Sequence, residues 1–335
     1  MHIIAVLCVY VSILSCNIAA LSTKTNVLFI VMDDLRPLFK SYGVDYMITP
    51  NIDALSRRSV LFENAFCSVP VCLPSRNSLV TGLKPETIHS YGFENSFAPH
   101  ISFPEHFRKI NYNLAGYGKI FHANDVEGNL PGVGYGIDES KWYEYQNLES
   151  KLFKSTVYAD RNTPEEKFRD YEFTTRAMEG LRHLAKRPEY FFLAVGYKLP
   201  HIHIHMPHKY FEMYRSRKSV WESVSPKALR FPPSAPAIAY RCCALLDYHY
   251  LTNHNATSAD TYSHIESNSD LTNMTLAKPA LMHTELMWAY SAAITFLDSQ
   301  VGRLMVTLDE LSLWDNITIV LTSDHGMNNG EKGLW

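Results

Sequence analysis

The sequence has few cysteines, no surplus of basic residues and no internal hydrophobic run long enough to cross a membrane. Only 6 of its 335 residues are cysteine, which excludes a small scaffold held by disulfides. Lysine and arginine number 31 against 34 acidic residues, so no basic excess points to nucleic acid or an anionic membrane. No internal apolar run approaches the roughly 18 to 20 residues of a spanning helix. With 46% hydrophobic and 19% charged residues, the composition is that of a packed globular protein.

The first twenty residues form an apolar stretch that contains no Asp, Glu, Lys or Arg and closes on small residues. This pattern predicts a secretory signal peptide over residues 1–20, cleaved near Ala20. His2 is the only candidate positive charge before the apolar stretch, so a retained signal anchor is the alternative. We expect the chain to enter the secretory pathway, to be lysosomal or secreted, and to have no stable membrane insertion after cleavage.

Sequons and cysteines fit that compartment without defining it further. Three Asn-x-Thr sequons begin at Asn255, Asn273 and Asn316. Cleavage of the signal peptide leaves four cysteines, of which Cys242 and Cys243 are adjacent, and a bridge between neighbours strains the intervening peptide. Four thiols allow three full pairings, so the sequence leaves the pairing of Cys67, Cys242 and Cys243 open.

Short apolar runs alternate with amphipathic patterns along the chain. The run NVLFIVM at residues 26–32 is typical of a strand buried on both faces of a parallel sheet. Further strands are expected at 60–65, 114–117, 190–195 and 317–322, and helices at 51–59, 75–80, 165–186 and 282–313. This alternation predicts an α/β fold with a mostly parallel central sheet flanked by helices. Residues 216–280 show no sustained period and are interpreted as a long surface excursion within one domain over 21–335.

Two of the predicted strands end in acidic or imidazole side chains. Asp33 and Asp34 follow the first strand, and Asp324 and His325 follow the last. Ligands of parallel α/β sheets bind at the carboxyl ends of strands, and carboxylates with an imidazole are ligands for a divalent cation. An excess of hard oxygen donors favours calcium or magnesium over zinc. An isolated Asp-Asp pair is more often a turn or a helix cap, but a second acidic strand end favours the metal site.

The segment Cys72-Leu73-Pro74-Ser75-Arg76 places a thiol just ahead of a predicted helix, with a cation four residues later. Amide groups at a helix N-terminus and a nearby positive charge both stabilise an anion. On spacing alone, a buried structural cysteine followed by a proline-initiated helix is the better explanation of the segment. The surrounding sequence decides between the two interpretations.

Two sets of basic residues admit simple structural explanations. The segment HIHIHMPH contains His201, His203, His205 and His208. Its alternate histidines would face one side of an extended strand, which makes a zinc or copper site a minor alternative to a pocket rim or surface. Lys119 and His122 are three residues apart, so on a helix they would be an ordinary exposed pair.

Seven segments, among them NVLFIVMDDLRP, VCLPSRNSLVTGLKP, GYGKIFH, FFLAVGYKLPHI and LTSDHG, occur in the order of the type I sulfatase family. The sequence resembles that family and, within it, the iduronate-2-sulfatase subfamily. The resemblance runs from Asn26 to the C-terminus. It implies a fold of the alkaline phosphatase/sulfatase type and a sulfuric ester hydrolase that cleaves sulfate esters of glycosaminoglycans such as heparan or dermatan sulfate.

The same resemblance assigns roles to the candidate residues. The formylglycine-generating enzyme would oxidise Cys72 to formylglycine, whose hydrated gem-diol is the nucleophile. Calcium would be bound by Asp33, Asp34, position 72, Asp324 and His325. Arg76 and Lys119 would offset charge on the sulfate, while His122 would act as the base for the diol and His201 as the acid for the departing sugar oxygen.

The chain also departs from the family pattern. After Gly330-Glu331-Lys332-Gly333-Leu334-Trp335 the sequence stops, so the family's substrate-contacting lysine would fall just beyond it. The smaller C-terminal subdomain is not represented, and we expect an open sheet edge and an uncovered apolar face. The family's Leu-Thr-Gly-Arg is replaced by Val-Thr-Gly-Leu at residues 80–83, which should reduce conversion of Cys72. The family's His-Lys-Pro-His pattern is altered to Lys-Leu-Pro-His at residues 198–201, so its lysine is displaced to Lys198 or lost. The alternative is therefore a non-catalytic chain that binds calcium and sulfated glycans without turnover.

Overall fold

A computed structural model describes residues 24–93, 97, 99–122, 157–223 and 277–333. Its centre is a four-stranded sheet in which every pairing is parallel. The strands are ordered β2, β4, β1 and β6, with bounds Asn113–Gly118, Phe191–Pro200, Asn26–Asp33 and Ile317–Ser323. The prediction of a mostly parallel α/β sheet is confirmed, and the four central strands lie within a few residues of their predicted positions.

Both faces of the central sheet are covered, as the unbroken apolar run of β1 predicts. Leu28, Ile30 and Met32 point into one core cluster, whereas Phe29 and Val31 point into a second cluster on the opposite face. Successive side chains of a strand alternate between the two faces, so a strand with two buried faces must be apolar at nearly every position. The sheet is consequently the middle layer of three.

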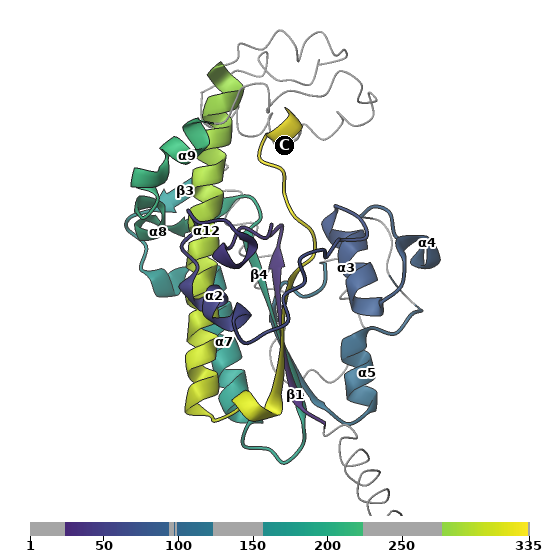
Figure 1. Ribbon diagram of the computed structural model, residues 1–335. Helices are drawn as coiled ribbons and strands as arrows, with labels where there is room; N and C mark the ends of the chain where they lie inside the picture. Colours follow the sequence, from purple (N-terminus) through teal and green to yellow (C-terminus); the bar gives the residue numbers. More distant parts are fainter. Residues whose placement is uncertain (1–23, 94–96, 98, 123–156, 224–276, 334–335) are drawn as a thin grey trace, which may run out of the picture.

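Helices form the two outer layers (Figure 1). On one face lie α2 (Pro50–Ser56), α7 (Arg169–Leu184) and α12 (Ala277–Glu310), and on the other lie α3 (Cys72–Thr81) and α5 (Phe103–Lys109). Shorter helices are α4 (Pro85–Ile88), α8 (His208–Glu212) and α9 (Ser219–Glu222), and a separate parallel pair joins β3 (Val157–Asp160) to β5 (Ile204–Pro207). Single 3-10 turns cover Lys40–Tyr42, Glu165–Lys167, Arg215–Arg217, Trp314–Asn316 and Glu331–Gly333.

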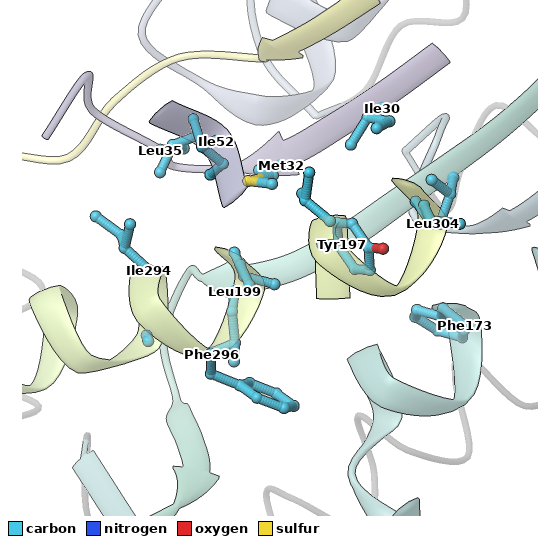
Figure 2. Close-up of a cluster of buried hydrophobic side chains, with 14 of the residues drawn as sticks. Ile30, Met32, Leu35, Ile52, Phe173, Tyr197, Leu199, Ile294, Phe296 and Leu304 are labelled. Atoms are coloured by element: carbon cyan, nitrogen blue, oxygen red, sulfur yellow. The ribbon is translucent and has the colours of Figure 1, made fainter. Parts of the chain in front are cut away.

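The long helix α12 provides much of the larger core. The sequence predicts one buried face from apolar residues three and four apart, and Leu286, Leu297 and Leu304 on that face are at most 2% exposed. Figure 2 shows Ile294, Phe296 and Leu304 of α12 in one cluster with Tyr197 and Leu199 of β4 and Met32 of β1. The prediction of this helix is confirmed, and its packing fixes α12 rigidly against the sheet.

The strand predicted at 60–65 is wrong, because those residues form an irregular segment. Val60 and Phe62 are 80% and 71% exposed, and no described strand pairs with this segment. The apolar run at residues 60–62 is compatible with a strand, but a strand needs a neighbour to receive its hydrogen bonds. At the edge of the described sheet, β6 pairs with β1 on one side, has no described strand on its other side, and its Val320 is 39% exposed.

Several sequence expectations lie outside the described residues. These are the signal peptide at 1–20, the sequons at Asn255 and Asn273, the cysteines Cys242 and Cys243 and most of the excursion at 216–280. Asn316 is exposed at the end of a short 3-10 turn. Cys67 and Cys72 carry free thiols. Among the described helices, none has both the length and the apolarity needed to cross a membrane.

A buried carboxylate on α12 supplies the N-terminal cap of α2. Asp298 accepts hydrogen bonds from the backbone N–H of Ile52 at 2.7 Å and of Asn51 at 3.3 Å, and from the Asn51 side chain at 2.8 Å. The residue at the start of α2, Thr49, makes no side-chain cap bond of its own. The long helix therefore satisfies the first amides of a helix that is remote in sequence.

We expect Asp298→Ala to lower the free energy of unfolding by about 2 kcal/mol, because it leaves buried amide donors without an acceptor. Burial raises the pKa of Asp298 to about 6 in the folded chain. The wild-type contribution is therefore largest below about pH 4 and falls as pH rises through 6, so the loss should be greater at pH 5 than at pH 7.5. Urea unfolding at both pH values measures this, with exposed Asp45→Ala as the control, which should change neither value.

Candidate active site

Each of the four strands of the central sheet has a polar side chain at its carboxyl end or directly after it. Asp33 ends β1, Lys119 follows β2, His201 follows β4 and Asp324 follows β6. In a parallel sheet these ends meet at one edge, and the N-terminus of α3 brings Cys72 and Arg76 to the same place (Figure 1). Residues as far apart in sequence as Asp33 and Asp324 therefore share one buried cluster.

Close backbone approach between β2 and β4 sets the position of Lys119. The backbone N–H of Lys119 donates to the Gly196 carbonyl at 2.9 Å. A Cβ atom on Gly196 would lie 2.0 Å from the Lys119 carbonyl oxygen, and Gly118, at φ +76°, would clash in the same way with Gly196. Only glycine fits both positions, so the chain can turn sharply at the end of β2 and direct Lys119 into the cluster.

Arg76 organises the centre of the cluster. Its side chain is completely buried, with Nε 3.0 Å from Asp324 Oδ2 and Nη2 3.0 Å from Asp33 Oδ1. Nη1 donates to the carbonyl oxygens of Lys119 at 2.6 Å and Ile120 at 2.9 Å. Because these bonds use most of the guanidinium donors, Arg76 holds two strand ends and the Lys119 loop together. The resemblance implied a place in the sulfate pocket, whereas the structure shows Arg76 bound to protein groups.

Three carboxylates, Asp33, Asp34 and Asp324, are buried side by side at the ends of β1 and β6. Although burial opposes ionisation, the Lys119 ammonium, which bonds Asp33, and the nearby His201 and Arg76 hold the pKa of Asp33 well below its usual range. For Asp34, burial together with the charges of Asp33 and Asp324 raises the pKa well above its usual range. Burial also raises the pKa of Asp324, against the pull of Arg76.

This donor set fits a divalent cation. The ligand atoms of Asp33, Asp34 and Asp324 lie within 4.8 Å of one another, and two overlapping groups add Cys72 with His201 and Cys72 with His325. The three buried carboxylates face two buried cations, Arg76 and Lys119, so one negative charge is left over when the imidazoles are neutral. Adding a divalent cation would leave one positive charge, which matches the single negative charge of a sulfate ester. Carboxylate oxygens favour a hard cation.

Cys72 is the first residue of α3, three residues earlier than the predicted helix start. It is 7% exposed, and its Sγ lies 3.2 Å from Nε2 of His325. Burial and the charge of Asp33 raise the pKa of the thiol, against the effect of Lys119. A cysteine nucleophile acts as the thiolate, so a thiol held protonated beside three carboxylates is poorly suited to direct attack.

The two candidate acid–base histidines lie on either side of the cluster. His201 Nε2 is 4.0 Å from Asp33 Oδ2 and 3.9 Å from Asp34 Oδ2. His122 lies in a loop, not on a helix as its spacing from Lys119 allowed, and the Phe93 ring centroid is 5.3 Å from its own. Burial and Lys119 lower the pKa of His122 to about 4, and burial lowers that of His201 despite Asp33. Burial therefore disfavours the charged form of both imidazoles, while the charge of Asp33 opposes this effect.

The other histidines of HIHIHMPH do not join the cluster. Among the described residues, the groups suited to a metal contain His201 but none of His203, His205 and His208. His205 lies against the Phe168 ring, and His208 Nε2 is 3.1 Å from Glu212. The minor alternative of a zinc or copper site on this segment finds no support in the described geometry.

Some supporting residues carry no sequence signal. The carboxylate of Asp170 accepts from the backbone N–H of Lys198 at 2.9 Å and of Leu199 at 3.2 Å, which fixes the irregular end of β4 ahead of His201. Ser323 Oγ accepts from the Leu35 N–H at 3.0 Å. A buried aspartate on an amphipathic helix and a serine in a strand have many structural uses, so only their contacts identify them.

A sequence model of the family described as Sulfatase matches residues 25–335, and the chain therefore belongs to the sulfatase family. It is 29% identical to iduronate 2-sulfatase of Homo sapiens over 92% of this chain and 56% of the relative. It is 30% identical to a sulfatase of Formosa agariphila over 93% of this chain and 61% of the relative. The chain thus spans somewhat more than half the length of these curated relatives.

Solved structures confirm the fold. A protein in complex with its substrate D-glucosamine-2-N,6-O-disulfate superposes with a TM-score of 0.65 at 19% identity, over 93% of this chain and 67% of the other. A phosphonate monoester hydrolase of Silicibacter pomeroyi superposes with a TM-score of 0.62 at 20% identity, over 93% and 64%. Identities this low show a shared architecture of the alkaline phosphatase/sulfatase type, and function has to be argued from the site.

The close approach of the carboxylates of Asp33, Asp34 and Asp324 leads to a prediction about Asp34. We expect Asp34→Asn to raise the thermal midpoint of the metal-free chain, because it removes one of three adjacent buried charges and asparagine tolerates the φ of +63° at this position. The same variant should lose most of the stabilisation by a divalent cation, which for the wild type is about 2.7 kcal/mol at one hundred times the dissociation constant. Calorimetry with chelator and with calcium measures both effects.

The exposed Asp45→Asn is the matched control and should change neither midpoint nor metal response. A lower midpoint for metal-free Asp34→Asn, combined with an intact calcium response, would contradict the assignment of Asp34 to a cation site.

Proposed function

We propose that this chain hydrolyses sulfate esters with a nucleophile generated at Cys72. The observation that carries the proposal is the convergence of Cys72, Lys119, His122 and His201 on three buried carboxylates at the strand ends of a sulfatase-family domain. Cations and neutral imidazoles surround a cluster whose charge suits a divalent metal and a monoanionic ester.

Formylglycine at position 72 fits the observed chemistry better than a thiolate does. The unmodified thiol is held protonated by burial and by Asp33, so it is a poor nucleophile in this setting. A hydrated aldehyde there would instead supply a hydroxyl group that attacks sulfur. We infer that the formylglycine-generating enzyme acts on this segment in the secretory pathway, before the side chain becomes 7% exposed in the fold.

The metal in this proposal is calcium, held by Asp33, Asp34, Asp324, His325 and position 72. When bound, it would polarise the sulfate oxygens and lower the pKa of the hydroxyl at position 72. Arg76 keeps the ligands Asp33 and Asp324 in place, because it bonds both carboxylates. Lys119 bonds Asp33 and presents the one remaining cation of the cluster toward the substrate side.

His122 and His201 are suited to proton transfer at opposite ends of the ester. The depressed pKa of His122 keeps its imidazole neutral, and its buried Nδ1 has no hydrogen-bond partner among the described residues. A neutral imidazole with a free ring nitrogen can accept the proton of the attacking hydroxyl. His201, next to Asp33 and Asp34, is the candidate donor to the departing sugar oxygen.

For the substrate, we propose sulfated glycosaminoglycans of the heparan or dermatan sulfate type and a lysosomal or secreted location. The support is similarity to iduronate 2-sulfatase at 29% identity, which concerns the domain as a whole and not the residues that select a sugar. The support for hydrolysis of sulfate esters is therefore stronger than the support for a particular sugar in the substrate.

The test begins with the chain secreted from a eukaryotic cell and the tryptic peptide Ser59–Arg76, which contains Cys67 and Cys72. Mass spectrometry should show an aldehyde in place of the thiol at Cys72, with Cys67 unchanged. The same sample should release sulfate from an aryl sulfate and from heparan disaccharides. An aldehyde without sulfate release would favour the non-catalytic glycan-binding alternative, and a full thiol at Cys72 would contradict the proposed nucleophile.

A further inference from the structure

Asp34 occupies an unusual backbone conformation for a residue of the acidic cluster. Its φ is +63°, in the left-handed region that side-chain-bearing residues rarely adopt. The residue directly follows β1, so this turn decides where its carboxylate points. Something in the surrounding structure has to hold the turn.

Three consecutive amides of this turn are each accepted by a different side chain. The N–H of Asp34 donates to Asp324 Oδ1 at 3.0 Å, and that of Leu35 donates to Ser323 Oγ at 3.0 Å. The N–H of Arg36 donates to the hydroxyl of Tyr290 at 2.8 Å. Asp324 and Ser323 belong to the end of the neighbouring strand, whereas Tyr290 comes from α12.

Tyr290 also binds the other side of the turn, because its hydroxyl donates to the Asp34 carbonyl oxygen. A single oxygen thus bridges the carbonyl of Asp34 and the amide of Arg36, and so spans Leu35 and holds the peptide group that directly follows the left-handed residue. The ring is 0% exposed and belongs to the larger core cluster. Since the ring is enclosed by the core cluster, the hydroxyl is held at a fixed point.

The side chain of Arg36 extends the same connection to the loop after β6. Its Nη1 lies 2.7 Å from Glu331 Oε1 and donates to the Met327 carbonyl at 3.3 Å. His283 of α12 also lies 2.7 Å from the Asn329 carbonyl through Nδ1. The helix therefore contacts both loops that carry the acidic cluster, and Tyr290 is its contact with the backbone of Asp34.

A buried tyrosine can also be a core residue that merely satisfies its hydroxyl. Tyr214 is such a case in the same chain: it is 0% exposed, accepts from the Ile48 N–H at 2.9 Å and bonds Thr295 Oγ1 at 2.7 Å. Its partners are remote from the acidic cluster. The two tyrosines are equally buried, and the hydroxyl of each accepts a backbone N–H. They differ in the backbone segment that this hydrogen bond holds in place.

We infer that Tyr290 is a positioning residue for the cation site, whose hydroxyl fixes the left-handed turn at Asp34 and thereby the direction of that carboxylate. The inference rests on the proposed function only in requiring a divalent cation at the cluster. It concerns binding of the ion, and it does not depend on turnover or on conversion of Cys72.

The experiment compares Tyr290→Phe with Tyr214→Phe, using the full chain and calcium chloride or magnesium chloride alone as the probe. Both variants delete one buried hydroxyl, so both should lower the midpoint of the metal-free chain by a similar amount. Only Tyr290→Phe should weaken cation affinity in titration calorimetry, by about tenfold or more, as expected for loss of a group that orients a ligand.

Ser323→Ala is the second variant, because it removes the acceptor of the Leu35 amide from the same turn without touching α12. It should also weaken cation affinity and keeps the inference testable if Tyr290→Phe does not fold. Unchanged affinity in Tyr290→Phe or Ser323→Ala, with clear binding by the wild type, would overturn the inference and leave the proposed function standing. A wild-type chain that binds neither ion would overturn the inference and the metal part of the function, while an aldehyde at Cys72 would still be detected separately.

Discussion

Under the proposed mechanism, replacement of Cys72 by alanine should abolish sulfate-ester hydrolysis, to below one part in about 10⁴ of the wild-type rate, because it removes the side chain from which the nucleophile is generated. The proposed cation ligands Asp33, Asp34, Asp324 and His325 remain, so calcium should still raise the thermal midpoint if it binds there as proposed. A steady-state assay with an aryl sulfate and a melting curve with and without calcium measure the two effects. Loss of activity with retained metal response is the expected combination.

Cys67→Ala provides the matched control. Cys67 lies five residues before Cys72 on the same tryptic peptide and is also a free thiol, but it is exposed. This variant should keep its activity and should still show the aldehyde at Cys72. Wild-type turnover by Cys72→Ala would refute the assignment of the nucleophile, and loss of activity in both variants would indicate that the segment tolerates no change.

The parallel sheet and the location of the site follow from short-range features of the sequence. The strand at 26–33 is apolar at nearly every position because both of its faces are covered, and its end is marked by Asp33 and Asp34. Parallel strands align their carboxyl ends, so the second acidic end at Asp324 had to lie nearby once both were taken as central strands. β1 pairs in parallel with β6, and this pairing brings the two acidic strand ends together.

Other features depend on contacts that no local pattern encodes. The segment 60–65 begins with an apolar run that is compatible with a strand but has no described neighbour to pair with, and local composition says nothing about partners. The helical pattern around Tyr290 explains why this tyrosine is buried, but it gives no sign of the hydrogen bond to Asp34. The histidine chemistry is a similar case, because the ordinary pKa of a histidine gives no warning that burial will keep His122 and His201 neutral.

The role of Arg76 could be predicted only in part from the sequence. Its place four residues after Cys72 is visible in the sequence, but its complete burial and its bonds to Asp33 and Asp324 are not. A buried ion pair adds little net stability over apolar packing, yet removing one partner leaves the other charge uncompensated. Because one arginine here serves two carboxylates and two carbonyl oxygens, its removal leaves several groups unpaired at once.

We therefore expect Arg76→Met to lower the free energy of unfolding by about 3–5 kcal/mol, a large part of the stability of a typical domain. Urea unfolding measures the loss, and Arg76→Lys, which keeps the charge but cannot bridge both carboxylates, should recover only part of it. Arg108→Met is the matched control: Arg108 also forms two bonds to one carboxylate, that of Glu105, but on the surface, so its midpoint should not move measurably. Equal stability of Arg76→Met and the wild type would show that Asp33 and Asp324 find other partners, and the central role given to Arg76 would then be wrong.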